Sequence, residues 1–256
     1  MKILVCIKQV ADVDSSLKLN SDSSWIEENK IAYMMNRYDE YALEEALLVK
    51  DVMPGTTVDV ISIGPGRAVS VVKKSLEKGA DNGIHVLCDN PALSAVKTSS
   101  VIAQYAGDKN YDIIFTGVMS EDLMQSQVGP MVASFLSIPC AVSVVNTEMI
   151  NNSTAISAAS ELEGGIIENI EITLPCLIAV QTGMNRPRYP SLSNVMRARS
   201  MEVVSMNIEN FKIPESYEEL VSLEYPPVSS KGIIINGSSE DKADKLLDLL
   251  HEKAII

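Results

Sequence analysis

The stretch "TTVDVISIGPGRAVSVVKKSLEKGADNGIHVL" (Thr56–Leu87) decides the class of fold. It opens with an apolar run that ends at Gly64, continues through an amphipathic run that ends at Gly79, and closes with the apolar run "GIHVL". A glycine directly after a helical run is a common signal for the end of a helix. A strand, a helix and a second strand in this order form a β-α-β unit with parallel strands. We therefore expect an α/β fold built on a parallel sheet.

The same alternation continues on both sides of this stretch. "KILVCIK" (Lys2–Lys8) is an uninterrupted apolar run, typical of a strand that is buried on both faces. Asp39–Asp51 has apolar residues at helical spacing, with Asn36 or Asp39 able to cap its start. Later segments predict further elements in turn, namely a helix over Asn90–Gly107, a strand over Tyr111–Gly117, a helix over Gln125–Pro139 and a strand over "CAVSVV". The prediction is a mostly parallel twisted sheet with helices on both faces.

The pattern changes after Val145. Two alternating runs joined by "EGG" within Ser153–Val180 predict an antiparallel hairpin followed by a buried strand. Beyond Met201 the chain is acidic, rich in proline and irregular until "SSEDKADKLLDLLHEKAI", which predicts an amphipathic helix. We therefore divide the chain into an α/β domain, residues 1–200, and a C-terminal arm, residues 201–256, that packs on a partner.

The composition excludes several classes of protein. The chain has 256 residues, 46% hydrophobic content and a net charge of −13, which suits a globular protein and argues against nucleic-acid binding. Four separated cysteines and only two histidines favour a reducing compartment and disfavour a metal site. The first residues lack a signal-peptide pattern, and no apolar run approaches the ~20 residues of a membrane span. We expect a cytoplasmic protein without membrane insertion.

Ligands of parallel sheets bind beyond the carboxyl ends of the strands, so the loops at those ends are the candidate ligand sites. In "ISIGPGRA", two glycines and Arg67 suit an anion, but the glycines are equally well explained by a tight turn. "TGVMSEDLMQSQVGP" (Thr116–Pro130) places hydroxyl and amide side chains beside a helix start, as in a phosphate cradle. The alternative is a helix capped by Ser126 or Asp122.

A base-binding segment is suggested by "NRYDEY", because Asn36 and Asp39 suit the hydrogen-bonding edge of a base and Tyr38 suits a planar ring. Capping by Asn36 is compatible with this role. The common nucleophile, metalloprotease and P-loop motifs are absent. The residues therefore predict a nucleotide-binding domain without evident catalytic residues.

One further segment, "TGMNRPRYPSLSNVMRAR" (Thr182–Arg199), holds four of the six arginines of the chain. Pro187 and Pro190 stiffen it, and Leu192 stands among polar neighbours. We call it the recognition segment.

The chain resembles the β (small) subunit of electron transfer flavoproteins. Five stretches carry the resemblance in the order of the family and span Lys2 to Ala198: "KILVCIKQVADVD", "NRYDEYALEEAL", "ISIGPGRA", "GVMSEDLMQSQVGPMVASFL" and "LPCLIAVQTGMNRPRYPSLSNVMRA". The most specific is N-x-P-R-Y-x-S-L in the last of them. The "ELEGG" hairpin, "GVMSEDLMQSQVG" and "KGIIINGSSEDKADKLLDLL" look closest to the subtype that serves trimethylamine-dehydrogenase-like partners.

The resemblance implies an adenine-nucleotide α-hydrolase-like (Rossmann-like) fold and an electron carrier rather than an enzyme. In the family, this subunit pairs with a larger α subunit that holds the redox FAD, and it buries a structural AMP. The loop that matches Pro190–Arg199 recognises a flavoprotein dehydrogenase, and Leu192 inserts into its pocket with Tyr189 and Arg197 beside it. The alternative for Leu192 is packing on its own subunit.

The resemblance also implies the nucleotide contacts, residue by residue. The loop after the first strand lies near the adenine and contains Lys8, Gln9 and Val10, and a second segment contacts the adenosine through Asn36, Arg37, Tyr38 and Asp39. The end of the second strand, at Ile63 and Gly64, lies beside this segment. The phosphate is held by a loop that contains Ser120, Asp122, Gln125, Ser126, Gln127, Val128 and Gly129.

Two other functions stay open. Flavin-bifurcating members hold a second FAD in place of AMP, oxidise NADH, and usually read N-P-Y-D and D-G-D-T-A-Q-V-G-P. Arg37, Leu123, Met124 and Gln125 depart from those motifs, which favours AMP. The second alternative is a stand-alone adenine-nucleotide sensor or ligase, although the S-G-G-x-D-S loop of such ligases is absent.

Overall fold

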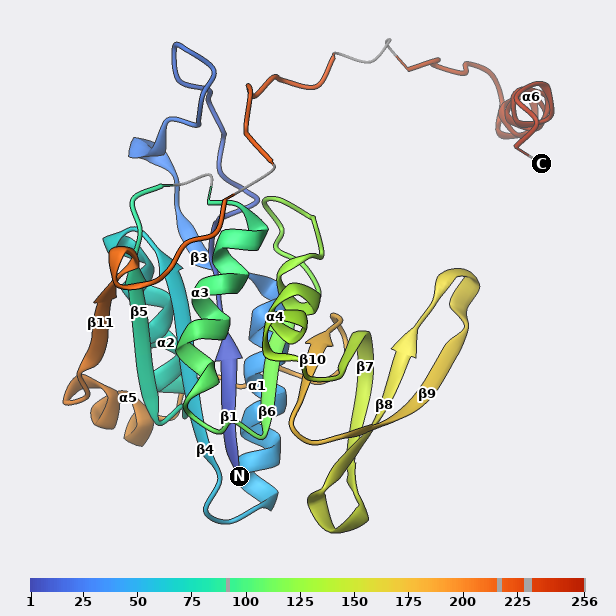
Figure 1. Cartoon of the computed structure of the whole chain (residues 1–256). Helices are drawn as coiled ribbons and strands as arrows, with labels where there is room; N and C mark the ends of the chain where they lie inside the picture. The colour runs from blue at the N-terminus through green and yellow to red at the C-terminus, as the bar shows by residue number, and fades with distance from the viewer. Residues whose placement is uncertain (91–92, 216–217, 228–231, 256) are drawn as a thin grey trace. The chain divides into compact units, whose positions relative to one another are not determined.

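The computed structural model describes residues 1–90, 93–215, 218–227 and 232–255 (Figure 1). The chain forms two compact units, Met1–Ser222 and Leu223–Ile256, and each is described by itself. The first unit extends beyond residue 200, where the sequence pattern placed the domain boundary. The packing of residues 201–256 on a partner stays a prediction.

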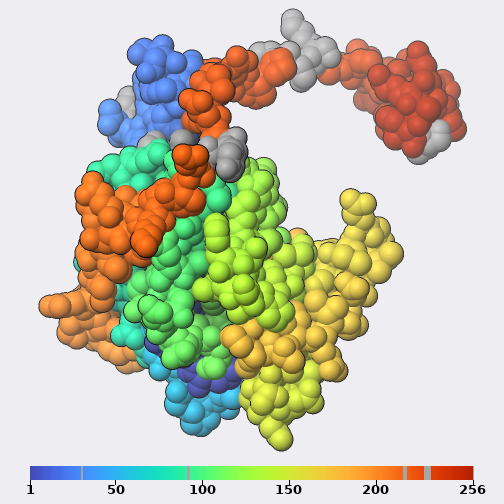
Figure 2. Space-filling model, viewed as in Figure 1, coloured from blue at the N-terminus to red at the C-terminus, as the bar shows by residue number. Residues whose placement is uncertain are grey.

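The first unit is built on one nine-stranded sheet with the order β11-β5-β4-β1-β6-β10-β7-β8-β9. Neighbours from β11 to β7 are parallel, and β8 and β9 are antiparallel. The bounds, in sheet order, are Val203–Asn207, Asn82–Leu87, Thr57–Gly64, Lys2–Cys6, Ile113–Gly117, Cys176–Val180, Cys140–Ile150, Ala155–Glu161 and Ile167–Thr173. The expected mostly parallel sheet and its hairpin are thus confirmed. The hairpin of β8 and β9, yellow in Figure 2, projects from the body of the unit.

Helices cover both faces of the sheet, which explains why the central strands are mostly apolar, with a few buried polar residues such as Asp59 and Ser62 in β4. On one face, α1 (Arg37–Val52) and α2 (Val69–Lys78) pack into one apolar cluster. On the other, α3 (Ala95–Gly107) and α4 (Val128–Leu136) pack into a second cluster (Figure 1). Burial of apolar area on both faces is the main stabilising contribution of this arrangement.

Several helices begin later than their sequence patterns predict. The predicted helix from Asn90 begins at Ala95, where the Ser94 hydroxyl accepts a hydrogen bond from the Lys97 N–H, and Pro91 lies outside the described residues. The helix expected from Gln125 begins at Val128, because residues 124 and 126 before it have positive φ angles of 52° and 54°. A short 3₁₀ helix, η2 (Gly66–Ala68), precedes α2.

Some elements do not follow from the sequence pattern. A small antiparallel sheet pairs β2 (Gln9–Ala11) with β3 (Tyr33–Met35), and the recognition segment contains α5 (Leu192–Arg199). The expectation of irregular chain from Met201 is wrong at Val203–Asn207, which forms the parallel edge strand β11. An edge strand has only one strand neighbour, so its apolar pattern is weak. Short 3₁₀ helices are η1 (Glu28–Lys30), η3 (Asn151–Ser153), η4 (Glu163–Gly165) and η5 (Ile208–Asn210).

The second unit contains α6 (Ser239–Glu252), which confirms the predicted C-terminal helix. Its start is a capping box, in which the Ser238 hydroxyl accepts from the Asp241 N–H at 3.1 Å and the Asp241 carboxylate accepts from the Ser238 N–H at 3.1 Å. Across the described ranges of both units, every helix is too short or too polar to cross a membrane.

Candidate nucleotide site and recognition segment

The sheet order defines a switch point at its centre. From β1 the chain passes to β4 and β5 on one side, and it returns to β6 on the other side of β1. Connections that diverge in this way leave a crevice beyond the carboxyl ends of the two central strands. Lys8 follows β1, Asn36 to Asp39 open α1, and Ser120 follows β6. The structure therefore brings these predicted site residues together at one edge of the sheet.

Asp39 joins the ends of the two central strands. Its side chain is buried, at 6% exposed, and its carboxylate accepts hydrogen bonds from the Lys8 N–H at 2.7 Å and the Gly117 N–H at 3.1 Å. Burial raises the pKa of Asp39 from 3.8 to about 7, against the opposing effect of Asn36 and these two backbone donors. Both carboxylate oxygens are thus engaged by the protein, so Asp39 shapes the crevice.

Asn36 ties the start of α1 to the loop after β6. It is buried, its amide donates to the Met119 carbonyl at 2.9 Å, and its side-chain oxygen accepts from the Glu121 N–H at 3.1 Å. It stands at the N-cap position of α1, but its side chain makes no cap hydrogen bond, so the expected side-chain capping is wrong. Next to it, the exposed Arg37 lies 3.6 Å from Glu121.

Lys8 spans the crevice. Its ammonium lies 2.7 Å from an Asp122 oxygen and 3.3 Å from the Ser120 hydroxyl, and both members of the ion pair are about one-third exposed. A partly exposed pair of this kind is weakly held, so the cation can turn to an anionic ligand. Asp122 pairs with Lys8 and makes no cap hydrogen bond to the following helix, so the expected capping by Asp122 is wrong.

The backbone approaches unusually closely at two glycines, Gly117 and Gly129. A Cβ at Gly117 would overlap the Asp39 carboxylate and the Tyr38 Cβ, and a Cβ at Gly129 would lie 2.8 Å from the Thr116 hydroxyl. Thr116 is 4% exposed, and its hydroxyl has no hydrogen-bond partner within the described chain. An unpaired buried hydroxyl beside the free N–H groups of the α4 start fits an anionic oxygen such as that of a phosphate.

The loop before α4 leaves polar side chains exposed. Gln125, Ser126 and Gln127 are exposed, and Gln127 occupies the N-cap position without a side-chain cap hydrogen bond. Capping by Ser126, the alternative raised by the sequence, is therefore wrong. Val128 is half-buried at the first position of the helix.

The remaining predicted contacts lie along β4 and β2. The carbonyl of Gly64, after Ile63 at the end of β4, pairs with the ring of His85 at 3.0 Å. Val10 is buried, and the Gln9 amide donates to the Ser70 hydroxyl at 2.9 Å.

Arg67, a candidate anion contact, is engaged within the protein. Its guanidinium lies 3.1 Å from Glu28 and 4.1 Å from the centre of the Tyr33 ring. The positive charge of Arg67 in the glycine-rich turn Gly64–Arg67 is therefore already neutralised by a carboxylate of the same chain.

The recognition segment presents apolar side chains to solvent. Tyr189, Leu192 and Met196 are 94%, 79% and 56% exposed. The Ser191 hydroxyl caps α5 by accepting from the Asn194 N–H at 3.2 Å. Leu192 is thus not packed on its own subunit, which was the alternative that the sequence left open.

Two arginines fasten this segment to the body of the unit. Arg188 donates to both Glu44 oxygens at 3.0 Å and to Asp51 at 2.8 Å, and both acids belong to α1. Arg197 donates to the carbonyls of Leu76 and Ala80 at 3.1 and 2.9 Å.

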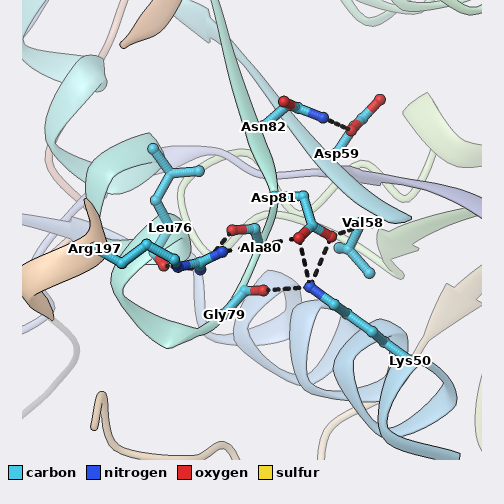
Figure 3. A network of polar contacts seen from close by, with 9 residues as sticks. All are labelled: Lys50, Val58, Asp59, Leu76, Gly79, Ala80, Asp81, Asn82 and Arg197. Carbon is cyan, nitrogen blue, oxygen red and sulfur yellow. Dashed lines mark hydrogen bonds and ion pairs between the residues drawn. The ribbon is translucent and has the colours of Figure 1, made fainter. Parts of the chain in front are cut away.

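Figure 3 shows the second anchor. The guanidinium of Arg197 reaches the last turn of α2, while Lys50 from α1 meets Asp81 at 2.6 and 2.7 Å just before β5. Arg197 also lies 3.8 Å from Asp81. Its guanidinium is therefore largely committed to its own subunit, although the sequence placed it at the partner contact, which stays a prediction.

A mostly parallel sheet with polar loops gathered at its switch point is the arrangement in which α/β proteins commonly bind ligands. Residues 24–210 match the family described as "Electron transfer flavoprotein domain". The chain is 31% identical over 255 residues to the mitochondrial electron transfer flavoprotein subunit beta of Arabidopsis thaliana, covering 99% of each chain. It is also similar to two bacterial proteins named electron transfer flavoprotein subunit beta. It is 28% identical over 261 residues to the one from Methylophilus methylotrophus, covering 98% of each chain, and 29% identical over 260 residues to the one from Bacillus subtilis (strain 168), covering 99% of each.

The chain therefore belongs to the electron transfer flavoprotein family. The prediction of a beta subunit is confirmed by these relatives, which it matches over almost their whole length. The trimethylamine-dehydrogenase-like subtype stays a prediction.

Proposed function

We propose that this chain pairs with a larger α subunit that carries a redox FAD, and that the heterodimer shuttles electrons from a flavoprotein dehydrogenase to an acceptor. The FAD would supply the electron-transfer chemistry, and this chain would be an electron carrier subunit that makes or breaks no bonds. The relatives named as beta subunits support the pairing. A cytoplasmic location is part of the same proposal.

The observation that carries the proposal is the exposed, clamped recognition segment. Leu192 is 79% exposed, yet the chain on both sides of it is fastened by Arg188 and Arg197. An exposed leucine on a rigid support suits insertion into a partner pocket, because little conformational entropy is lost on docking. One anchor of modest area also suits a brief encounter, which a carrier needs.

We further propose that the crevice between β1 and β6 holds AMP. The Thr116 hydroxyl and the start of α4 suit the phosphate, and Lys8 supplies a partly exposed cation beside them. In this proposal Tyr38 at the start of α1 would contact the adenosine, and Asn36 would hold the neighbouring loop through its hydrogen bonds to Met119 and Glu121. A second FAD with NADH oxidation is the alternative, and the departures at Met124 and Gln125 from the bifurcating motif weigh against it.

Co-expression with the α subunit gene tests the pairing. The expected result is a yellow heterodimer whose flavin is reduced by a flavoprotein dehydrogenase of the same organism in the presence of its substrate. A colourless chain that stays monomeric beside the α subunit would contradict the proposal.

A further inference from the structure

Charge is strongly segregated along this chain. Residues 110–185 contain no lysine or arginine, whereas residues 172–201 contain no aspartate or glutamate and four of the six arginines. The recognition segment is therefore cationic along the sequence of a protein of net charge −13, and Glu44, Asp51 and Asp81 of neighbouring elements pair with two of its four arginines. A local charge of this kind acts at close range even when the net charge has the opposite sign, because salt screens distant charges beyond about 10 Å.

The four arginines divide into two pairs with different surroundings. Arg188 and Arg197 form hydrogen bonds within the chain, Arg188 with α1 and Arg197 with the end of α2. Arg186 and Arg199 are exposed and form no ion pair with any residue that the structure describes. Among the residues that the structure describes, Arg199 makes one polar contact, with the Met196 sulfur at 3.8 Å. Two guanidinium groups are therefore available to a partner.

These two cations bracket the exposed apolar side chains. Leu192, Met196 and Arg199 are spaced at i, i+4 and i+7, so they lie along one face of α5. Arg186 stands at the other end of the segment, before Pro187 and the exposed Tyr189. The surface thus consists of an apolar centre with a positive group at each end.

We infer that Arg186 and Arg199 steer this segment onto a flavoprotein dehydrogenase whose docking pocket is apolar and rimmed by carboxylates. The inference rests on the proposed docking function and adds the chemistry of the partner surface. Guanidinium groups at the rim of an interface raise the association rate, whereas a buried apolar anchor mainly slows dissociation. Carboxylates are the natural complement, because they accept paired hydrogen bonds from arginine.

A partner protein fits this surface better than an anionic membrane. The helix that carries Leu192 has eight residues, and only Leu192 and Met196 are its large exposed apolar side chains. Peripheral membrane helices bury a much larger apolar face than these two side chains provide.

The test measures flavin reduction in the heterodimer by the dehydrogenase identified through the co-expression experiment, from about 0.05 M to about 0.5 M salt. We expect the second-order rate constant of the wild type to fall as salt increases. In Arg186→Gln/Arg199→Gln it should be about tenfold lower at low salt and should converge with wild type at high salt. The control Lys97→Gln/Lys212→Gln makes the same change of net charge on the α3 side of the sheet and should behave as wild type.

Leu192→Ala separates steering from docking, because it should lower the rate at every salt concentration. One outcome is a lowered rate constant in Leu192→Ala together with a rate constant in the double arginine variant that equals that of the wild type at low salt. This outcome would overturn steering by Arg186 and Arg199 and would leave docking through Leu192 supported. If Leu192→Ala equals wild type, the docking function and the inference built on it both fail. Binding to vesicles of phosphatidylcholine and phosphatidylglycerol that is lost in both variants would instead identify a membrane surface and overturn the inference.

Discussion

A buried carboxylate at the end of two strands gives the first prediction, at the scale of single residues. The pKa of Asp39 rises from 3.8 to about 7 on folding, so the folded chain holds a proton that the unfolded chain has lost between these pH values. The free energy of unfolding should therefore decrease as pH rises through this window, by up to about 1.4 kcal/mol per pH unit, and level off above it. Urea unfolding of the full chain, followed by circular dichroism at a series of pH values, measures this dependence.

The matched variant is Asp39→Asn, which cannot ionise but keeps the size of the side chain. Its amide presents a donor to one of the two backbone N–H groups, so it should be less stable than wild type at low pH. The difference in unfolding free energy between wild type and variant should shrink as pH rises from about 4 to about 7. A difference in unfolding free energy that stays constant over this pH range would contradict the raised pKa of Asp39.

Gly117 gives a second prediction at this scale. A methyl group at this position would overlap the carboxylate of Asp39 and the side chain of Tyr38, so Gly117→Ala should displace the start of α1 from the crevice. We expect the purified heterodimer to lose most of its AMP while keeping its FAD, as measured by mass spectrometry of the released nucleotides. Gly107→Ala is the control, because nothing lies within 4 Å of the added carbon. Full AMP content in Gly117→Ala would refute the close approach.

At the scale of elements, α1 connects the two functional regions. Its first turn faces the crevice through Asp39, and further along it Glu44 holds Arg188 of the recognition segment. Glu45 on the same helix bonds to Thr147 of β7 and to Asn185. One helix thus sets the position of both the proposed nucleotide site and the proposed docking surface.

The anchor on α1 can be removed by Glu44→Ala. Glu44 is buried and accepts three hydrogen bonds from Arg188, and hydrogen bonds to charged groups contribute about 1.5–3 kcal/mol. We expect amide hydrogen exchange in residues 188–199 to become about tenfold to a hundredfold faster in the heterodimer, with unchanged exchange in β1. Glu168→Ala, an exposed glutamate on β9, is the control. Unchanged protection of α5 in Glu44→Ala would show that Arg188 is not its anchor.

The elements differ in how far the sequence predicts them. The strands β1, β4 and β6 are predictable, because both of their faces are covered and their residues are mostly apolar. β11 and the β2–β3 pair are not, because their stability comes from neighbours distant in the chain rather than from a local pattern. Both α3 and α4 also begin later in the structure than their sequence patterns predict. For α4 the reason is that two residues before it adopt left-handed backbone angles.

The same distinction applies to the site. Lys8, Asn36 and Ser120 could be placed at the crevice, since they follow the carboxyl ends of predicted parallel strands or open the next helix. The stretch that begins with Thr116 and Gly117 could be predicted as a phosphate cradle, but the individual roles of these two residues could not, because they depend on close approaches across the fold. The pairing of Arg67 with Glu28 is a long-range contact as well, so a free cation was expected there.

At the scale of the whole molecule, the chain is a scaffold with its functions on separate surfaces. The unit Met1–Ser222 contains the crevice and the recognition segment. The unit from Leu223 contributes α6, whose Leu246 and Leu247 are about half exposed, and Ile233 and Ile234 before it are 70% and 83% exposed. Apolar side chains left uncovered in this way suit the proposed packing of the arm on the α subunit.

The central claim is that this chain holds an adenine nucleotide of its own beside the FAD of its partner. The most direct test is the identity and amount of the nucleotides released when the purified heterodimer is denatured, measured by mass spectrometry. We predict equal amounts of FAD and AMP. Twice as much FAD as heterodimer, with no AMP, would assign the crevice to a second flavin, and FAD alone in equal amount would show that the crevice between β1 and β6 is not a nucleotide site.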